Sequence, residues 1–424
     1  MANIIKKEVL KSALKEQFEA FLVGSCGVER EMLKQAGAII NSPQIAVITG
    51  LRRAGKSTFL RQIAGKHLKN KFYFVNFEDE RLSDFPAADF DFLHETLIGL
   101  FGEKKVFLFD EIQNVSGWEK FVRRLHDQGY KFVITGSNAS LLSQEFGTRL
   151  TGRSIKMELF PFSFREFLAF QKFDLFDLKV MTARQKSRLI KASEDYLLMG
   201  GIPDALKYPE LAIHKELYED VLYRDVAARY NLGDAKNLKD LAFFLASNAP
   251  SLVSFNKIKD LLKLGSVNTV KSYVDYLENS WLFFVVNKYA FSVKEQQIAA
   301  KKIYGVDTGL IKSVGFAFSQ NLGKAMENAV YLHLRRRHQD IYYYKTGQNY
   351  EVDFFLPKEN IFVQSCYDFD VLEVRERELR ALAAAAEEKS NPAGMTVVTA
   401  RTKETIKQKK SIIQVLPLYE WLLC

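Results

Sequence analysis

The stretch Ile45-Ala46-Val47-Ile48-Thr49-Gly50-Leu51-Arg52-Arg53-Ala54-Gly55-Lys56-Ser57 decides the fold of this chain. Its first five residues form a short, largely β-branched apolar run, which is typical of a buried parallel strand. The next eight fit the pattern G-x-x-x-x-G-K-[ST]. Apolar residues then recur at helical spacing, at Phe59, Leu60, Ile63 and Ala64. Strand, glycine-rich loop and helix in this order predict an α/β fold built on a P-loop and a parallel sheet.

The glycine-rich loop predicts a binding site for a nucleoside triphosphate. Glycines let the backbone curl so that its N–H groups face the phosphates, and the following helix N-terminus adds partial positive charge. Lys56 can reach the β- and γ-phosphates, and the Ser57 hydroxyl can bind Mg²⁺. A chance glycine-rich turn is the alternative, but the pattern arises by accident in roughly one chain in a hundred of this length. No guanine-reading Asn-Lys-x-Asp motif is present, so ATP is the expected nucleotide. The residues predicted to hold it are Gly50, Leu51, Arg52, Arg53, Ala54, Gly55, Lys56, Ser57 and Thr58.

Two further apolar runs extend the predicted sheet. Phe72–Phe77 is one, and Val106–Phe109 is the other, leading directly into Asp110 and Glu111. An apolar strand that ends in adjacent carboxylates is the Walker B arrangement, in which Asp110 would hold Mg²⁺ and Glu111 would act as general base for the attacking water. Such a pair is often merely solvated. Its position 54 residues after Lys56, within alternating strands and helices, favours the catalytic interpretation.

A fourth apolar run, Phe132–Thr135, ends in Gly136-Ser137-Asn138. A polar side chain at this place could sense the γ-phosphate and orient the water, so Ser137 and Asn138 are both candidate catalytic residues. The alternative is a helix N-cap, which serine and asparagine also favour.

Two arginines, Arg149 and Arg153, follow this run. An arginine close to a subunit edge could reach the γ-phosphate of a neighbouring subunit and stabilise the charge of the transition state. We expect Arg153 to take this role, with Arg149 as the second choice. Most arginines are simply solvated or paired with carboxylates, which is the alternative for both.

These motifs resemble a family of bacterial and archaeal AAA-type ATPases. The stretches that carry the resemblance are Gly50–Ser57, Phe109–Gln113, Thr135–Ser137, Leu150–Arg153, Leu159–Phe167 and Gly200–Asp204. The likeness extends over roughly residues 20–420. It implies an AAA-type core, a winged-helix segment and a restriction-endonuclease-like C-terminal fold, and it supplies no substrate.

Length and composition set the remaining limits. A chain of 424 residues with 47% apolar and 26% charged residues is expected to form two or three soluble domains. Its three cysteines, Cys26, Cys366 and Cys424, form no CxxC pair, which argues against a disulfide framework and fits a reducing compartment. The N-terminus is amphipathic without a cleavage site, and no run approaches the roughly 18 apolar residues of a membrane span. We therefore expect a cytoplasmic protein with no membrane partner.

The pattern of apolar residues predicts four parts. They are an ATPase domain with an N-terminal helix over 1–170, a helical lid or linker over 171–235, a winged helix-turn-helix over 236–295 and an endonuclease-like domain over 296–424. The wing hairpin is expected to form from Trp281–Val286 and Lys288–Phe291.

The second helix of the winged segment is the candidate DNA-reading element. Its predicted exposed face carries Asn268, Lys271 and Ser272, but also Asp275 and Glu278. Carboxylates oppose deep insertion into a major groove, so a protein contact is as well supported as duplex DNA. The net charge of +9 is spread along the chain and does not choose between these partners.

The C-terminal part has the αβββαβ order of an endonuclease-like core, with Glu327 on a helix and Asp353 on a strand. The resemblance implies an acidic residue and a lysine two apart on the next strand of active members. This chain has Gln364 and Cys366 there. An amide is a poor ligand for a hard cation, and a thiol cannot replace the ammonium. We therefore expect a catalytically inactive binding or assembly module.

Three functions remain open from the sequence. The first is an AAA-type ATPase whose nucleotide cycle rearranges its C-terminal modules, with further copies of the chain as candidate partners in a homo-oligomer. The second is a slow, nucleotide-controlled switch that holds duplex DNA. The third, disfavoured by Gln364 and Cys366, is an ATP-dependent nuclease.

Overall fold

The computed structural model describes residues 7–137, 152–175, 177–233, 235–315, 321–389, 392–408 and 411–424. Asn138 and Arg149 lie outside these ranges. The chain divides into two compact units, Met1–Phe160 and Pro161–Cys424, and each is described by itself. The finer division into four parts stays a prediction.

The first unit contains a five-stranded parallel sheet with the order β2-β3-β4-β1-β5. The strands are β1 (Ile45–Thr49), β2 (Tyr73–Asn76), β3 (Val106–Asp110), β4 (Lys131–Gly136) and β5 (Ser154–Glu158). The first four were predicted. β5 was missed because only Ile155 and Met157 in it are apolar, and because an edge strand has one neighbour and needs fewer apolar residues.

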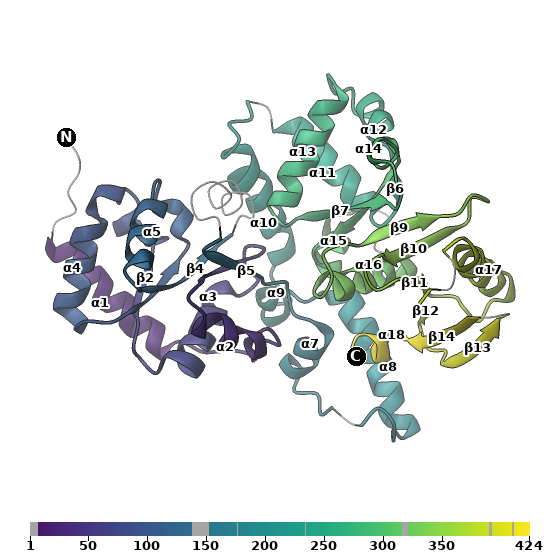
Figure 1. Ribbon diagram of the computed structural model, residues 1–424, viewed down its shortest axis with the longest axis horizontal. Helices are drawn as coiled ribbons and strands as arrows, with labels where there is room; N and C mark the ends of the chain where they lie inside the picture. Colours follow the sequence, from purple (N-terminus) through teal and green to yellow (C-terminus); the bar gives the residue numbers. More distant parts are fainter. Residues whose placement is uncertain are drawn as a thin grey trace. The chain divides into compact units, whose positions relative to one another are not determined.

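Helices cover both faces of this sheet, as Figure 1 shows. The helices are α1 (Lys7–Val23), α2 (Leu33–Asn41), α3 (Lys56–Ile63), α4 (Phe90–Phe101) and α5 (Glu119–Asp127). Alternate residues of a strand point to opposite faces. Ile45 and Val47 pack with residues of α4 and α5, whereas Ala46 and Ile48 pack with residues of α2 and α3. β1 is buried on both faces, which is why its sequence is continuously apolar.

The second unit contains the remaining elements. Its helices are α7 (Phe164–Phe170), α8 (Ala183–Met199), α9 (Pro203–Lys207), α10 (Ile213–Asp220), α11 (Lys236–Asn248), α12 (Phe255–Leu261), α13 (Val267–Asn279), α14 (Val293–Ile298), α15 (Thr308–Val314), α16 (Leu322–Arg335), α17 (Leu372–Glu388) and α18 (Leu418–Trp421). Its strands are β6 (Leu252–Val253), β7 (Phe283–Lys288), β8 (Lys301–Gly305), β9 (Tyr342–Lys345), β10 (Glu351–Leu356), β11 (Ile361–Cys366), β12 (Gly394–Thr399), β13 (Glu404–Gln408) and β14 (Ser411–Pro417). They form one nine-stranded sheet, in the order β13-β14-β12-β11-β10-β9-β7-β8-β6.

The wing hairpin predicted from Trp281–Val286 and Lys288–Phe291 is wrong. Residues 283–288 form the single strand β7, which pairs antiparallel with β8 and, at Asn287 and Lys288, parallel with β9. Asn287 is a residue type that turns favour, but here it stays in the strand and pairs with Tyr342 of β9, so the chain reverses only beyond Lys288. The segments predicted as a winged helix and as an endonuclease-like domain therefore contribute strands to one sheet.

The helix α13 confirms most of its predicted pattern. Val270, Val274 and Leu277 are buried. Glu278, expected on the exposed face, instead accepts a hydrogen bond from the Val285 backbone N–H at 3.0 Å, and burial raises its pKa to about 7. One of the two carboxylates that oppose DNA contact is thus turned toward β7. Asp275 remains exposed.

The C-terminal elements follow the predicted order, α16-β9-β10-β11-α17-β12. β9, β10 and β11 are antiparallel neighbours, whereas β11 and β12 are parallel and flank the α17 crossover. Among the helices of the described ranges, none is both long and apolar enough to cross a membrane.

Candidate nucleotide site

The P-loop joins β1 to α3 at the carboxyl edge of the sheet. Gly50 has φ 156°, and a Cβ there would lie 2.1 Å from the Leu159 carbonyl oxygen, so only glycine fits. Gly55, with φ 92°, is the left-handed residue directly before α3. The loop conformation thus needs glycine at both positions that define the motif.

The Lys56 ammonium lies inside the loop. Its Nζ is 3.3 Å from the carbonyl oxygens of Gly50 and Leu51 and 3.5 Å from a carboxylate oxygen of Glu111. The side chain is only 4% exposed. The two residues that the sequence assigned to phosphate binding and to water activation are therefore direct neighbours.

Asp110 lies at the end of β3 with oxygen-bearing side chains around it. It accepts hydrogen bonds from the Thr135 hydroxyl of β4 and from Ser57 of α3. Burial, followed by the charge of Glu111, raises the pKa of Asp110. A carboxylate and a hydroxyl side by side are the hard oxygen ligands that Mg²⁺ prefers, and a cation there would favour the charged carboxylate. Ser57 and Asp110 therefore fit a magnesium ion.

Glu111 has the charge state that a general base needs. Burial acts to raise the pKa of this carboxyl, but Lys56 and the hydrogen bond from the Gln113 amide outweigh it, and the pKa is lowered. Its backbone is left-handed, with φ 50°, a conformation that costs a non-glycine residue roughly 1–3 kcal/mol. The Glu111 backbone N–H is held by the Thr135 hydroxyl at 3.0 Å.

The other residues predicted to hold the nucleotide differ in burial and in backbone conformation. Leu51 and Ala54 are buried, Thr58 is half-buried and Arg53 has a left-handed backbone with φ 62°. Arg52 pairs with Glu78 at 3.3 Å.

Ser137 and Arg153 lie at opposite ends of the sheet. Ser137 follows β4 and is 4% exposed, at the same edge as the P-loop. The Arg153 carbonyl accepts from the Ile45 N–H at the start of β1, and its side chain pairs with Asp127 at 3.1 Å. The five residues of β1 separate it from the P-loop by about 16 Å, at roughly 3.3 Å per residue. Arg153 therefore lies far from the P-loop of its own chain.

Thr135 and Arg30 are site residues that sequence reasoning missed. Thr135 is fully buried and links Asp110 to Glu111. Arg30 donates to the Ala54 carbonyl of the P-loop at 2.9 Å and also to the Phe160 carbonyl. Both lie next to the site through long-range contacts, and a threonine in a strand or an arginine in a loop carries no signal of this.

Replacing Thr135 by valine is expected to weaken MgATP binding and turnover about tenfold. The change leaves the buried Glu111 N–H without its acceptor and Asp110 without a donor, at roughly 1–3 kcal/mol for an unpaired buried group. Titration with a fluorescent ATP analogue and steady-state hydrolysis would measure both effects. Thr135→Ser keeps the hydroxyl and is expected to stay close to wild type. Equal values for the valine and serine variants would contradict this role.

A second cluster of ionisable groups lies in the C-terminal unit. Lys302 of β8 places its Nζ 2.7 Å from Asp353 and 3.1 Å from Glu327. Burial acts to lower the pKa of Lys302, but Asp353 and Glu327 outweigh it and hold the pKa well above its ordinary value. Gln364 accepts from the Asp353 N–H and donates to Glu378 rather than facing a cation.

Cys366, two residues after Gln364 on β11, is also buried, and burial raises the pKa of its thiol to about 12. A neutral thiol supplies no charge to this cluster. Nothing in the sequence around Lys302 indicated that it would pair with Glu327 and Asp353.

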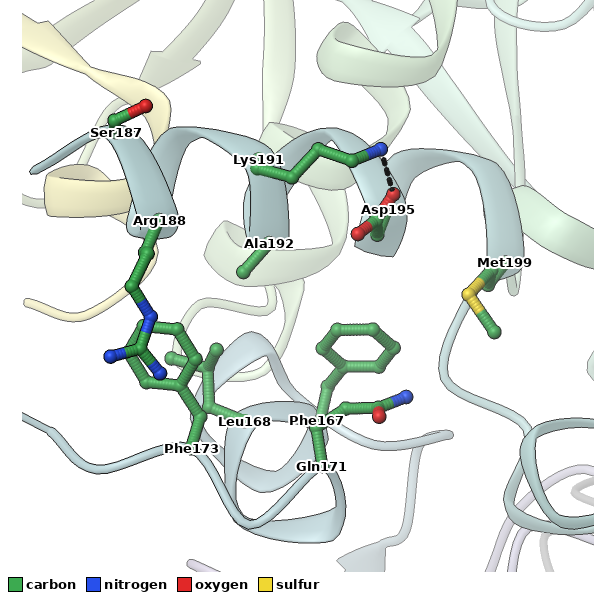
Figure 2. Close-up of a pocket in the computed structure, with 10 residues that line it drawn as sticks. All are labelled: Phe167, Leu168, Gln171, Phe173, Ser187, Arg188, Lys191, Ala192, Asp195 and Met199. Carbon is green, nitrogen blue, oxygen red and sulfur yellow. Dashed lines mark hydrogen bonds and ion pairs between the residues drawn. The ribbon is translucent and has the colours of Figure 1, made fainter. Parts of the chain in front are cut away.

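A hollow of about 760 Å³ lies between α7 and α8 (Figure 2). Phe167, Leu168 and Met199 are among its lining residues, which come from both helices. Its charged groups interact with each other or with the wall: Lys191 pairs with Asp195 at 2.6 Å, and Arg188 lies 4.8 Å from the Phe173 ring centre. Lys191 and Asp195 thus compensate each other's charge, and the Arg188 guanidinium lies against an aromatic ring.

Comparisons with known protein families match three consecutive parts of the chain. Residues 42–168 match the family described as AAA domain, residues 190–321 match a domain of unknown function (DUF8612), and residues 322–421 match another (DUF4143).

Two relatives extend over most of the chain. An uncharacterized protein of Methanocaldococcus jannaschii is 35% identical over 89% of this chain and 88% of its own length. An uncharacterized protein of Haemophilus influenzae is 33% identical over 76% of this chain and 82% of its own length. Among solved structures, the Aeropyrum pernix ORC1 protein in complex with DNA is 14% identical, over 76% of this chain and 94% of that one, with a TM-score of 0.28.

Proposed function

Since the chain belongs to the family of archaeal and bacterial proteins that join an AAA domain to C-terminal domains of unknown function, we propose that it binds MgATP, hydrolyses it, and couples the cycle to rearrangement of its C-terminal unit. The observation that carries this proposal is the cluster of Lys56, Glu111 and Asp110 at one edge of the sheet. These side chains lie at or shortly after the carboxyl ends of β1 and β3, and they match the needs of phosphoryl transfer to water.

In the proposed mechanism, the P-loop N–H groups and Lys56 bind the phosphates. Phosphate oxygens replace Glu111 as the partner of Lys56, which frees the Glu111 carboxylate to accept a proton from the attacking water. Gln113 and Thr135 hold Glu111 in position, through its side chain and its backbone N–H. Ser57 and Asp110 would hold a magnesium ion, which supplies charge neutralisation for the phosphates. Ser137 would orient the γ-phosphate or the water.

Coupling to the C-terminal unit is supported by what packs against the P-loop. The Leu159 N–H donates to Thr49, and the Leu159 carbonyl lies against Gly50. Arg30 binds the Ala54 carbonyl and the Phe160 carbonyl together. The next residue, Pro161, begins the second unit. A conformational change of the P-loop would therefore move Leu159 and Phe160, the residues that lead into the second unit.

Replacing Arg30 by methionine removes its hydrogen bonds to Ala54 and Phe160. We expect ATP still to bind, but its binding no longer to affect the residues that lead into the second unit. We expect hydrogen exchange at residues 159–163 to respond to MgATP in the wild type and to lose most of that response in the variant. Arg61→Met is the matched control, because Arg61 also donates to backbone carbonyls, those of Phe21 and Ser25, which are not among the residues that lead into the second unit. A wild-type response in Arg30→Met would contradict the transmission route.

The proposed activity is tested by MgATP hydrolysis over a range of protein concentrations, with and without duplex DNA. We expect the specific activity to rise with concentration, because Arg153 is too far from its own P-loop and would act in a neighbouring subunit of a homo-oligomer. Turnover no faster than that of Glu111→Gln would overturn the assignment as an ATPase.

A slow DNA-holding switch is the second candidate function. The inward position of Glu278 favours it, because the α13 surface around Asn268 and Lys271 then carries fewer carboxylates. Binding to duplex DNA that falls steeply with salt would support it. A cleavage assay with plasmid and Mg²⁺ separates both from the nuclease, for which Gln364 and Cys366 lead us to expect intact DNA.

A further inference from the structure

The C-terminal carboxylate cluster surrounds a single ammonium group. The Lys302 Nζ lies 2.7 Å from Asp353 Oδ1, 2.9 Å from Glu351 Oε1 and 3.1 Å from Glu327 Oε1. The ammonium donates hydrogen bonds to Asp353 and Glu327 and forms an ion pair with Glu351. The lysine residue is only 3% exposed and the Asp353 side chain 10%, whereas the Glu351 side chain at the rim of the cluster is 31% exposed.

Two of these carboxylates also accept hydrogen bonds from groups other than Lys302. Asp353 Oδ2 accepts the Ser365 backbone N–H at 2.9 Å, and Glu327 Oε1 also accepts the Tyr304 hydroxyl at 2.8 Å. A divalent cation at this place would need oxygens of the same carboxylates at about 2.0–2.6 Å. It could not share them with an ammonium, because two cations at such close range repel strongly in a buried site.

Lys302 is also fixed in place by its neighbours. Next to Glu327 on α16, Asn328 accepts the Gly305 N–H at 2.8 Å and donates to the Gly305 carbonyl at 2.9 Å, which fastens β8 to the helix. The Tyr304 and Tyr331 rings stack at 4.2 Å between the same two elements. The ammonium therefore cannot leave the carboxylates by a simple movement of β8.

We propose that the Lys302 ammonium is the resident cation of this cluster, occupying the place where a divalent metal ion would otherwise bind. Its ion pairs join β8 to α16 and β10. The carboxylates therefore stabilise the packing of the nine-stranded sheet and bind no metal. Glu327 and Asp353, which the sequence marked as remnants of a catalytic site, are ligands of this internal cation. This inference does not depend on nucleotide binding.

Manganese binding to the full-length, nucleotide-free protein tests the proposal, with free Mn²⁺ measured by electron paramagnetic resonance. We expect the wild type, Asp353→Asn and Glu327→Gln to bind equal amounts, since these carboxylates hold no metal when Lys302 is present. Lys302→Ala is expected to bind one additional Mn²⁺ per chain, and Lys302→Ala/Asp353→Asn to lose it. Manganese should also raise the melting temperature of Lys302→Ala more than that of the wild type.

Lys301→Ala is the matched control, because the neighbouring buried Lys301 donates to the Gln296 carbonyl instead of to this cluster. It is expected to bind manganese as the wild type does. Two results would overturn the proposal: loss of a manganese ion when Asp353→Asn or Glu327→Gln is introduced into the wild type, or no additional manganese in folded Lys302→Ala. If Lys302→Ala does not fold, the comparison of the wild type with the two carboxylate variants still decides.

Discussion

Glu111→Gln is expected to lower the rate of ATP hydrolysis by about 10²–10⁴-fold, the usual contribution of a general base. Glutamine keeps the shape and can still accept from Gln113, but it cannot take the proton of the attacking water. ATP affinity is expected to stay the same or to increase, because the variant no longer offers Lys56 a competing carboxylate. Single-turnover hydrolysis and equilibrium binding of ATP would separate the two effects.

Glu103→Gln is the matched control for this variant. Glu103 precedes the amino end of β3, is exposed and pairs with Lys105 at 3.1 Å, whereas Glu111 follows the carboxyl end of the same strand. The control is expected to hydrolyse ATP at the wild-type rate. If Glu111→Gln retained more than about a tenth of the wild-type rate, another group would have to be the base.

Arg153→Ala is expected to reduce turnover by a large factor, up to the roughly 10³–10⁵-fold contribution of an arginine finger. Its distance from the P-loop along β1 predicts that it acts on the nucleotide of a neighbouring subunit. Hydrolysis in a mixture of Arg153→Ala and Glu111→Gln is therefore expected to exceed that of either alone, because some sites then combine an intact base with an intact arginine. Steady-state hydrolysis at a range of mixing ratios would measure this.

Two controls accompany the arginine variant. Arg124→Ala removes an exposed arginine of the nearby α5 that pairs with Asp91, and it should leave turnover unchanged. Asp127→Ala frees Arg153 from its ion pair and should not lower the rate, because that pair is not needed when the arginine contacts phosphate. No gain of activity in the mixed sample, with both variants folded, would mean that Arg153 does not act between subunits.

The sequence alone determined the parts of the fold whose signals lie within a few consecutive residues. The P-loop was predictable because backbone curvature at Gly50 and Gly55 requires glycine, and because a doubly buried strand such as β1 must be continuously apolar. Asp110 and Glu111 were found by the same local logic, as carboxylates directly after an apolar strand. Roles for Asn138 and Arg149 stay predictions outside the described residues.

Only the tertiary structure decided the contacts between distant residues. Thr135 and Asp110 are 25 residues apart, Arg30 and Phe160 are 130 apart, and Lys302 and Asp353 are 51 apart. The first contact depends on β4 lying beside β3. The third depends on β8 pairing with β7 after the run that resembled a local hairpin. Strand order and long-range pairing are set by the packing of whole faces, and a single side chain, such as a lysine in a strand, does not encode which carboxylates will surround it.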